Sequence, residues 1–171
     1  SEDEGRSPVV SNAAPLSHDS ALRTQHSAGE RRQLTVMFCD LVGSTALSTQ
    51  LDPEDYRTVV QEYQTIGGAR IAKHQGHVAQ HLGDGLLVYF GYPAAHEDDA
   101  RRAVRAGLEI IEALREQGSG NGEQGGRRSL QVRIGIHSGL VVIGDIGAKG
   151  RTEQLALGET PNIAARIQGL A

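Results

Sequence analysis

Two aspartates stand where an apolar stretch ends and glycine follows. Asp40 lies in the segment FCDLVGST (38–45), and Asp84 lies in the segment HLGDGLL (81–87). A carboxylate just past a buried strand lies at the edge of a sheet, where two such strand ends can share a hard divalent cation. The loops that follow leave backbone N–H groups, which suit a bound polyphosphate. The pair therefore predicts a split magnesium site.

Each aspartate also has a simpler interpretation when it is taken alone. Asp-Gly is the commonest kind of hairpin turn, so residues 83–85 alone indicate only a turn. Asp40 alone could cap a helix that starts near residues 43–45.

A second pair of polar residues lies near the end of the chain. Asn162 and Arg166 are four residues apart on a predicted helix, so both side chains leave the same face and can act on one ligand. The alternative is a surface helix whose arginine pairs with some carboxylate.

The elements that must position these residues follow from apolar periodicity and turn residues. Asp52 with Pro53, and Thr160 with Pro161, are typical of a helix N-cap followed by proline at the first helical position. Ser138 and Gly139 predict a hinge between two strands, and residues 148–154 predict a polar arm. The expected elements are strands at 34–40, 77–82, 86–90, 130–137 and 140–144, and helices at 53–74, 96–117 and 161–170.

This order predicts an α+β fold. We expect a ferredoxin-like βαββαβ core with helices on one face of an antiparallel sheet, plus an extra hairpin arm and a C-terminal helix. Residues 1–30 lack periodicity and are predicted to be a disordered linker or tail, and residues 31–171 to be the domain.

Composition excludes several classes of function. The 171 residues carry a net charge of −4 with 17 basic residues spread along the chain, so no nucleic-acid partner is expected. Cys39 is the single cysteine, which rules out an internal disulfide. The single cysteine fits a cytoplasmic location. No apolar stretch approaches the roughly 20 residues that cross a bilayer, so we expect no membrane contact by this part of the protein. The glycine-rich stretch 118–128 lacks the spacing of a phosphate loop.

Four segments, in this order, resemble the class III adenylate/guanylate cyclase catalytic domain. They are residues 38–45, 81–87, 133–139 and 158–167, and the match runs from about Arg32 to the last residue. The resemblance implies that the ribose 3′-hydroxyl of a nucleoside triphosphate, preferably ATP, attacks its own α-phosphate. The products are a 3′,5′-cyclic nucleotide and pyrophosphate.

The resemblance also implies a role for each matching residue. Two cations per site, Mg²⁺ or Mn²⁺, are held between the aspartates, and the active unit is a homodimer in which the Asn/Arg pair comes from the partner. The implied assignments are metal binding by Asp40, Leu41 (through its carbonyl) and Asp84; phosphate binding by Val42, Gly43, Ser44, Thr45 and Arg133; and catalysis by Asn162 and Arg166.

Two positions depart from the family pattern. Where adenylate cyclases of this class usually carry lysine and then aspartate or threonine, this chain has Gln80 and Leu155, although a shifted alignment places Thr152 or Gln154 in the second position. Glutamine can donate or accept and leucine can do neither, so poor discrimination between adenine and guanine is expected.

The family also continues with further strands, so the domain is expected to be truncated at its C-terminus. The alternative function is a catalytically degenerate, dimerising module that regulates or senses nucleotide. A diguanylate cyclase is disfavoured, because its Gly-Gly-Asp/Glu-Glu-Phe turn is absent.

Overall fold

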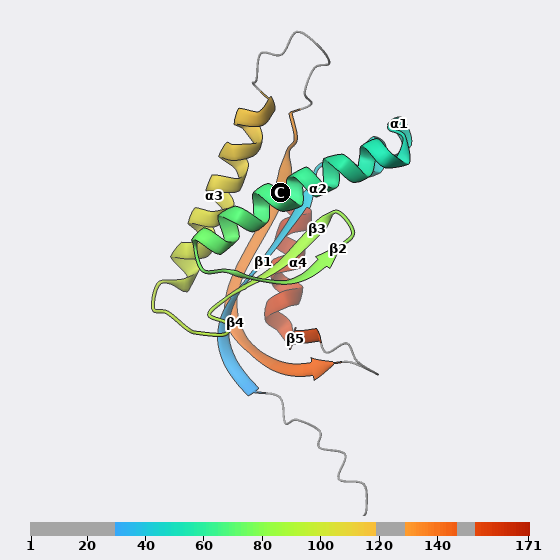
Figure 1. Ribbon diagram of the computed structural model, residues 1–171. Coiled ribbons are helices and arrows are strands. Elements are labelled where there is room, and N and C mark those ends of the chain that lie inside the picture. Colours follow the sequence, from blue (N-terminus) through green and yellow to red (C-terminus); the bar gives the residue numbers. More distant parts are fainter. Residues whose placement is uncertain (1–29, 119–128, 147–152) are drawn as a thin grey trace, which may run out of the picture.

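The described part of the chain is built on a five-stranded antiparallel sheet with four helices (Figure 1). The computed structural model describes residues 30–118, 129–146 and 153–171. The strand order is β2-β3-β1-β4-β5, and its first four strands have the ferredoxin-like arrangement, which confirms the predicted α+β class. The elements are β1 (Glu30–Leu41), α1 (Ser44–Gln50), α2 (Pro53–Lys73), β2 (His77–Leu82), β3 (Gly85–Phe90), α3 (Asp99–Gly118), β4 (Val132–Ile146), β5 (Glu153–Leu157) and α4 (Glu159–Leu170).

β1 lies in the middle of the sheet because its side chains are apolar toward both faces. Met37 and Cys39 pack in one core cluster with residues of α2 and α3. Leu34 and Val36 point to the opposite face and belong to a second cluster. Antiparallel ladders to β3 and β4 flank β1 on both sides, so the position of its C-terminal end is well determined.

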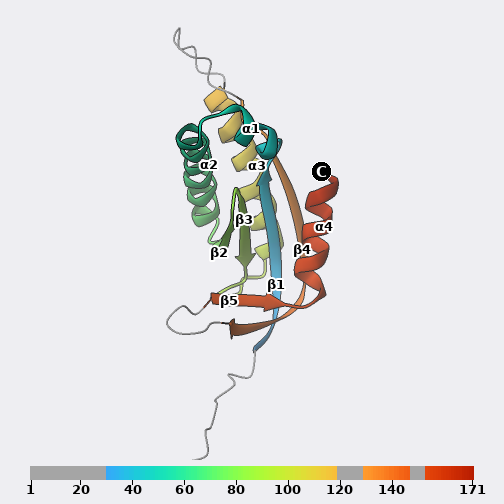
Figure 2. The same ribbon diagram turned by 90° about the vertical axis from the view of Figure 1, so that its right-hand side faces the viewer.

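The helices cover opposite faces of the sheet (Figure 2). α2 and α3 pack on one face, as predicted, and the C-terminal helix α4 packs on the other through the fully buried Ala164. Glycines on β4 allow this close approach: a Cβ added to Gly135 would overlap the carbonyl oxygen of Ala164, and one added to Gly139 would overlap the hydroxyl of Thr160.

Two local predictions are wrong. β4 is one continuous, strongly curved strand through Ser138 and Gly139 (Figure 1), with Ser138 Oγ 2.7 Å from Thr35 Oγ1 across the ladder, so the expected hinge is absent. Thr160 does not cap α4, because Gly158 occupies the N-cap position. The Thr160 hydroxyl is buried instead and donates to the carbonyl oxygen of Leu140 at 3.1 Å.

The ends of the elements also differ from the sequence expectation. β1 begins at Glu30, which the sequence placed in the linker, and the rest of that linker lies outside the described residues. The predicted polar arm 148–154 is also largely outside them, and its last two residues open β5. Among the described residues, no helix is both long and apolar enough to cross a membrane.

Candidate active site

The fold brings Asp40 and Asp84 together. Asp40 is the penultimate residue of β1, and Asp84 lies in the turn between β2 and β3. The ladder between β1 and β3 continues to the pair Cys39 and Leu86, so the two acids meet at one end of the sheet. Both line a cavity of about 200 Å³, whose other walls include Phe38, Leu82, Leu86 and Gln168.

The charges in this cavity are poorly compensated. Burial raises the pKa of Asp40, the adjacent Asp84 carboxyl raises it further, and the Arg133 guanidinium opposes the rise. Arg133 Nη2 donates to Asp40 Oδ2 at 3.3 Å, yet Arg133 Nε and Asp84 Oδ2 are buried without a hydrogen-bond partner. Two crowded carboxyls with an unpartnered oxygen are a donor set that fits a hard divalent cation.

Among the described residues, no third side-chain ligand completes this pair. Across residues 30–118, 129–146 and 153–171 there is no group of three or more histidine, cysteine, aspartate or glutamate side chains placed to hold a metal. A cation here would therefore need oxygen ligands from the backbone, such as the Leu41 carbonyl, and from a bound phosphate.

α2 holds the backbone just ahead of each aspartate. Tyr63 Oη donates to the carbonyl oxygen of Cys39 at 3.1 Å, and Gln64 Nε2 donates to the carbonyl oxygen of Gly83 at 3.0 Å. Tyr63 is fully buried. The two hydrogen bonds are not predictable from the sequence, because nothing local in the sequence indicates which distant carbonyls the two side chains reach.

We expect Asp40→Asn to raise the unfolding midpoint of the metal-free protein at neutral pH. Because the folded-state pKa of Asp40 is raised, its contribution to stability falls as pH rises from the ordinary carboxyl range through that pKa. Asparagine cannot ionise and removes this loss. Exposed or partly exposed charge pairs contribute up to about 1 kcal/mol, so a rise of about 1–3 °C is expected.

Calorimetry at pH 7.5 with a chelator measures this effect. Asp98→Asn is the matched control, because its pairing with Arg102 lowers the pKa of Asp98, so that variant should show no rise. A fall in the midpoint for Asp40→Asn, or a rise that persists equally at low pH where carboxyls are protonated, would contradict a raised pKa of Asp40 in the folded protein.

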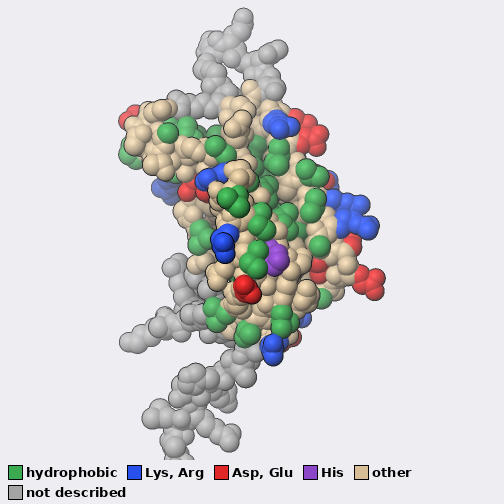
Figure 3. Space-filling view, turned by 180° about the vertical axis from the view of Figure 1, so that it is seen from behind, with side chains coloured by type: hydrophobic (Ala, Val, Ile, Leu, Met, Phe, Trp, Pro, Cys, Tyr) green, Lys and Arg blue, Asp and Glu red, His purple; other side chains and the backbone are tan. Residues whose placement is uncertain are grey.

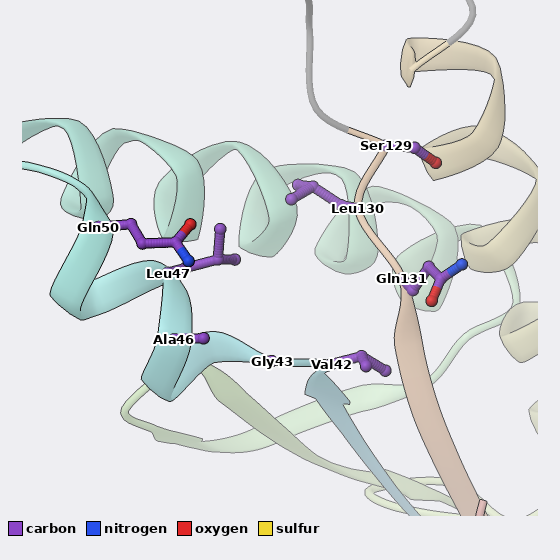
Figure 4. A pocket seen from close by; sticks show the side chains of 8 residues that line it. All are labelled: Val42, Gly43, Ala46, Leu47, Gln50, Ser129, Leu130 and Gln131. Carbon is purple, nitrogen blue, oxygen red and sulfur yellow. The ribbon is translucent and has the colours of Figure 1, made fainter.

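The predicted phosphate loop is only partly available. The Val42 N–H donates to the carbonyl oxygen of Gln131 at 2.8 Å, so the expectation that it faces a phosphate is wrong. Gly43 adopts a left-handed conformation with φ 70° and leads into α1 at Ser44. Gly43, Ser44 and Thr45 thus remain as the candidate amide donors. On another side of this loop, α1 and residues 129–131 enclose a cavity of about 420 Å³ (Figure 4).

Asn162 and Arg166 do not face the acids of their own chain. Thr160 and Ala164 mark the buried side of α4, and Asn162 and Arg166 are exposed. The face that carries α4 shows basic side chains among apolar ones (Figure 3). Within one chain, neither residue lines the Asp40–Asp84 cavity, although Gln168 of the same helix does.

The two candidate base-recognition positions lie on opposite edge strands. Gln80 is half-buried on β2, and Leu155 lies on β5, where it pairs with Gly144. The sheet is curled, so that the edge strand β5 comes close to β3 across the concave face. The Ala156 N–H of β5 donates to Tyr89 Oη of β3 at 3.0 Å.

Comparison with known proteins identifies the family. A sequence model of the adenylate and guanylate cyclase catalytic domain matches residues 27–171. The chain belongs to this family. The cyclase domain is 32% identical over 143 residues to adenylate cyclase 1 of Rhizobium meliloti (strain 1021), covering 84% of this chain and 21% of that protein. It therefore spans about a fifth of that relative's length.

Solved structures of the family have the same fold as this cyclase domain. The guanylyl cyclase Cya2 superimposes with a TM-score of 0.77 at 38% identity, covering 84% of this chain and 72% of that one. The adenylyl cyclase CyaB from P. aeruginosa gives a TM-score of 0.74 at 30% identity, covering 82% and 73%. Since one of these proteins is a guanylyl and the other an adenylyl cyclase, the comparisons support nucleotidyl cyclase chemistry without distinguishing the base.

Proposed function

We propose that this domain cyclises a nucleoside triphosphate, with ATP preferred, to a 3′,5′-cyclic nucleotide and pyrophosphate in cyclic-nucleotide signalling. The observation that carries the proposal is the convergence of Asp40 and Asp84 on one cavity, in a chain whose family model spans residues 27–171.

The residues around the cavity divide the work of the reaction. Two Mg²⁺ or Mn²⁺ ions, held by Asp40, Asp84 and the Leu41 carbonyl, would supply activation of the 3′-hydroxyl and neutralise the triphosphate. The amides of residues 43–45 bind the β- and γ-phosphates. Arg133, whose Nη2 lies 3.3 Å from Asp40 Oδ2, donates to a phosphate oxygen.

The remaining two groups come from a second copy of the chain. Because Asn162 and Arg166 are exposed on α4 and do not line the cavity of their own acids, we propose a head-to-tail homodimer in which they complete the partner's site. Arg166 meets the charge that develops at the α-phosphate, and Asn162 orients the ribose. Exposed apolar side chains on the same helix and on the strand packed against it, Ile167 of α4 and Leu140 of β4, suit burial against a partner.

Weak base selectivity is part of the proposal. Gln80 lies half-buried on β2, and its carboxamide can present either a donor or an acceptor to a purine edge. A leucine at position 155 adds no hydrogen bond. We therefore expect product from both ATP and GTP, with ATP the better substrate.

Product analysis tests the proposal. Incubation with Mn²⁺ and either ATP or GTP, followed by chromatography, should show a cyclic nucleotide and pyrophosphate in equal amounts. Asp84→Asn should lower the rate by at least about 10²-fold, and the substitution Asp98→Asn on the surface should leave it unchanged. Nucleotide binding without any cyclic product would instead support the regulatory or nucleotide-sensing alternative.

A further inference from the structure

Two consecutive residues of α2 contact the backbone ahead of both aspartates. Tyr63 Oη donates to the Cys39 carbonyl, one residue before Asp40, and Gln64 Nε2 donates to the Gly83 carbonyl, one residue before Asp84. The acids come from segments more than forty residues apart in the sequence. Adjacent side chains on one rigid helix thus join the two halves of the candidate metal site.

The two carbonyl groups that accept these hydrogen bonds differ in how strongly the rest of the fold restrains them. Cys39 lies inside β1 and is paired on both sides, with Leu86 of β3 and Ile134 of β4. Gly83 lies at the tip of a hairpin, is exposed and has φ 64°. Because a glycine-flanked turn has several accessible conformations, the Gln64 contact is the more important restraint on its aspartate.

The buried side chain of Tyr63 also anchors α2 in the core. It is 0% exposed, as is Ile71 two turns later on the same side of α2, so this side of the helix is embedded in the core cluster. The position of α2 is thereby fixed relative to the sheet. The hydrogen bonds from Tyr63 and Gln64 of α2 therefore restrain the backbone that carries the two carboxylates.

We propose that Tyr63 and Gln64 are positioning residues that set the spacing of Asp40 and Asp84 for a divalent cation, with Gln64 the main determinant of the Asp84 turn. This inference rests on the proposed function, because it concerns the same metal site. Outer groups that orient metal ligands typically change metal affinity by about 10–100-fold. The positioning acts through the backbone and requires no contact between α2 and the cation.

Direct Mn²⁺ titration, followed by the loss of the free-ion electron paramagnetic resonance signal, tests this without turnover. Gln64→Met should weaken Mn²⁺ binding about 10-fold with little change in the unfolding midpoint of the metal-free protein. Gln61→Met, the same substitution at an exposed position one turn earlier on α2, should change neither quantity. Tyr63→Phe should lower both the affinity and the midpoint, because a buried carbonyl loses its donor.

Several outcomes would overturn the inference. Unchanged Mn²⁺ affinity in folded Gln64→Met, with Gln64→Glu as a second variant that also lacks the donor, removes the positioning role and leaves the proposed function intact. Equal loss in Gln61→Met shows a general effect of the helix surface and removes it as well. If the unsubstituted protein binds no Mn²⁺ with or without nucleotide, both this inference and the metal-dependent function fail.

Discussion

Mixing Asp40→Ala protein with Arg166→Ala protein should restore cyclase activity that neither variant has alone. In the proposed homodimer, each variant lacks one half of every site, and loss of a group that stabilises the transition state costs about 10²–10³ in rate. In a heterodimer of the two, one site carries both lesions and the other carries none. Random exchange makes about half of the dimers mixed, so about a quarter of the original activity should return.

A second mixture provides the control. Asp40→Ala mixed with Asp84→Ala should not recover, because Asp40 and Asp84 line the same cavity and every mixed dimer then lacks one acid in each site. Subunit exchange is confirmed by differently labelled chains. Recovery in this control, or none in the first mixture after exchange, is incompatible with sites shared in the proposed way.

The placement of the acids was predictable from the sequence because each lies next to an apolar strand: Asp40 ends the apolar part of β1, and Asp84 lies in the turn directly before the apolar strand β3. Once β1 and β3 pair in an antiparallel sheet, the end of β1 and the start of β3 lie at the same edge, which brings the two carboxylates together. The order of strands and helices carried the same information for the ferredoxin-like core.

Long-range hydrogen bonds were not predictable in this way. Val42 follows a predicted strand, and nothing in the sequence indicates a partner for its N–H group. In the structure this N–H donates to the carbonyl oxygen of Gln131, which is distant in the sequence. Thr160 has the residue type of an N-cap, and its hydroxyl is used by Leu140 on β4 instead. In both cases a tertiary partner satisfies a group that local rules assign to a loop or a cap.

The prediction for β4 failed for a related reason. Ser138 and Gly139 are typical of a turn, and in isolation they would interrupt a strand. Here Ser138 faces Thr35 across the ladder at 2.7 Å between hydroxyl oxygens, and Gly139 makes room for Thr160. The glycine therefore reflects the close approach of α4, which sequence periodicity cannot distinguish from a turn.

Gly135→Ala should both destabilise the protein and impair the site that α4 is proposed to complete in the partner. A Cβ at Gly135 would overlap backbone atoms of α4, the Ala164 carbonyl oxygen and the Gln168 nitrogen, and a helix backbone cannot move aside without shifting as a unit. Overpacking of this kind costs about 1–3 kcal/mol, which corresponds to a fall of about 3–10 °C in the unfolding midpoint. Displacement of α4 also moves Asn162 and Arg166, so activity should fall even at temperatures where the variant is folded.

Gly144→Ala is a closely matched control on the same strand. An added Cβ there meets nothing within 4 Å, so its midpoint and activity should stay near those of the unsubstituted protein. Mixing Gly135→Ala with Asp40→Ala then separates the two effects. The only site in the mixed dimer with both acids takes its Asn/Arg pair from the undisturbed α4 of the Asp40→Ala chain, and it should be active if the lesion is confined to the displaced helix. Failure to recover despite confirmed exchange would show that α4 displacement also damages the acids of its own chain, since Gly135 is the ladder partner of Phe38, two residues from Asp40.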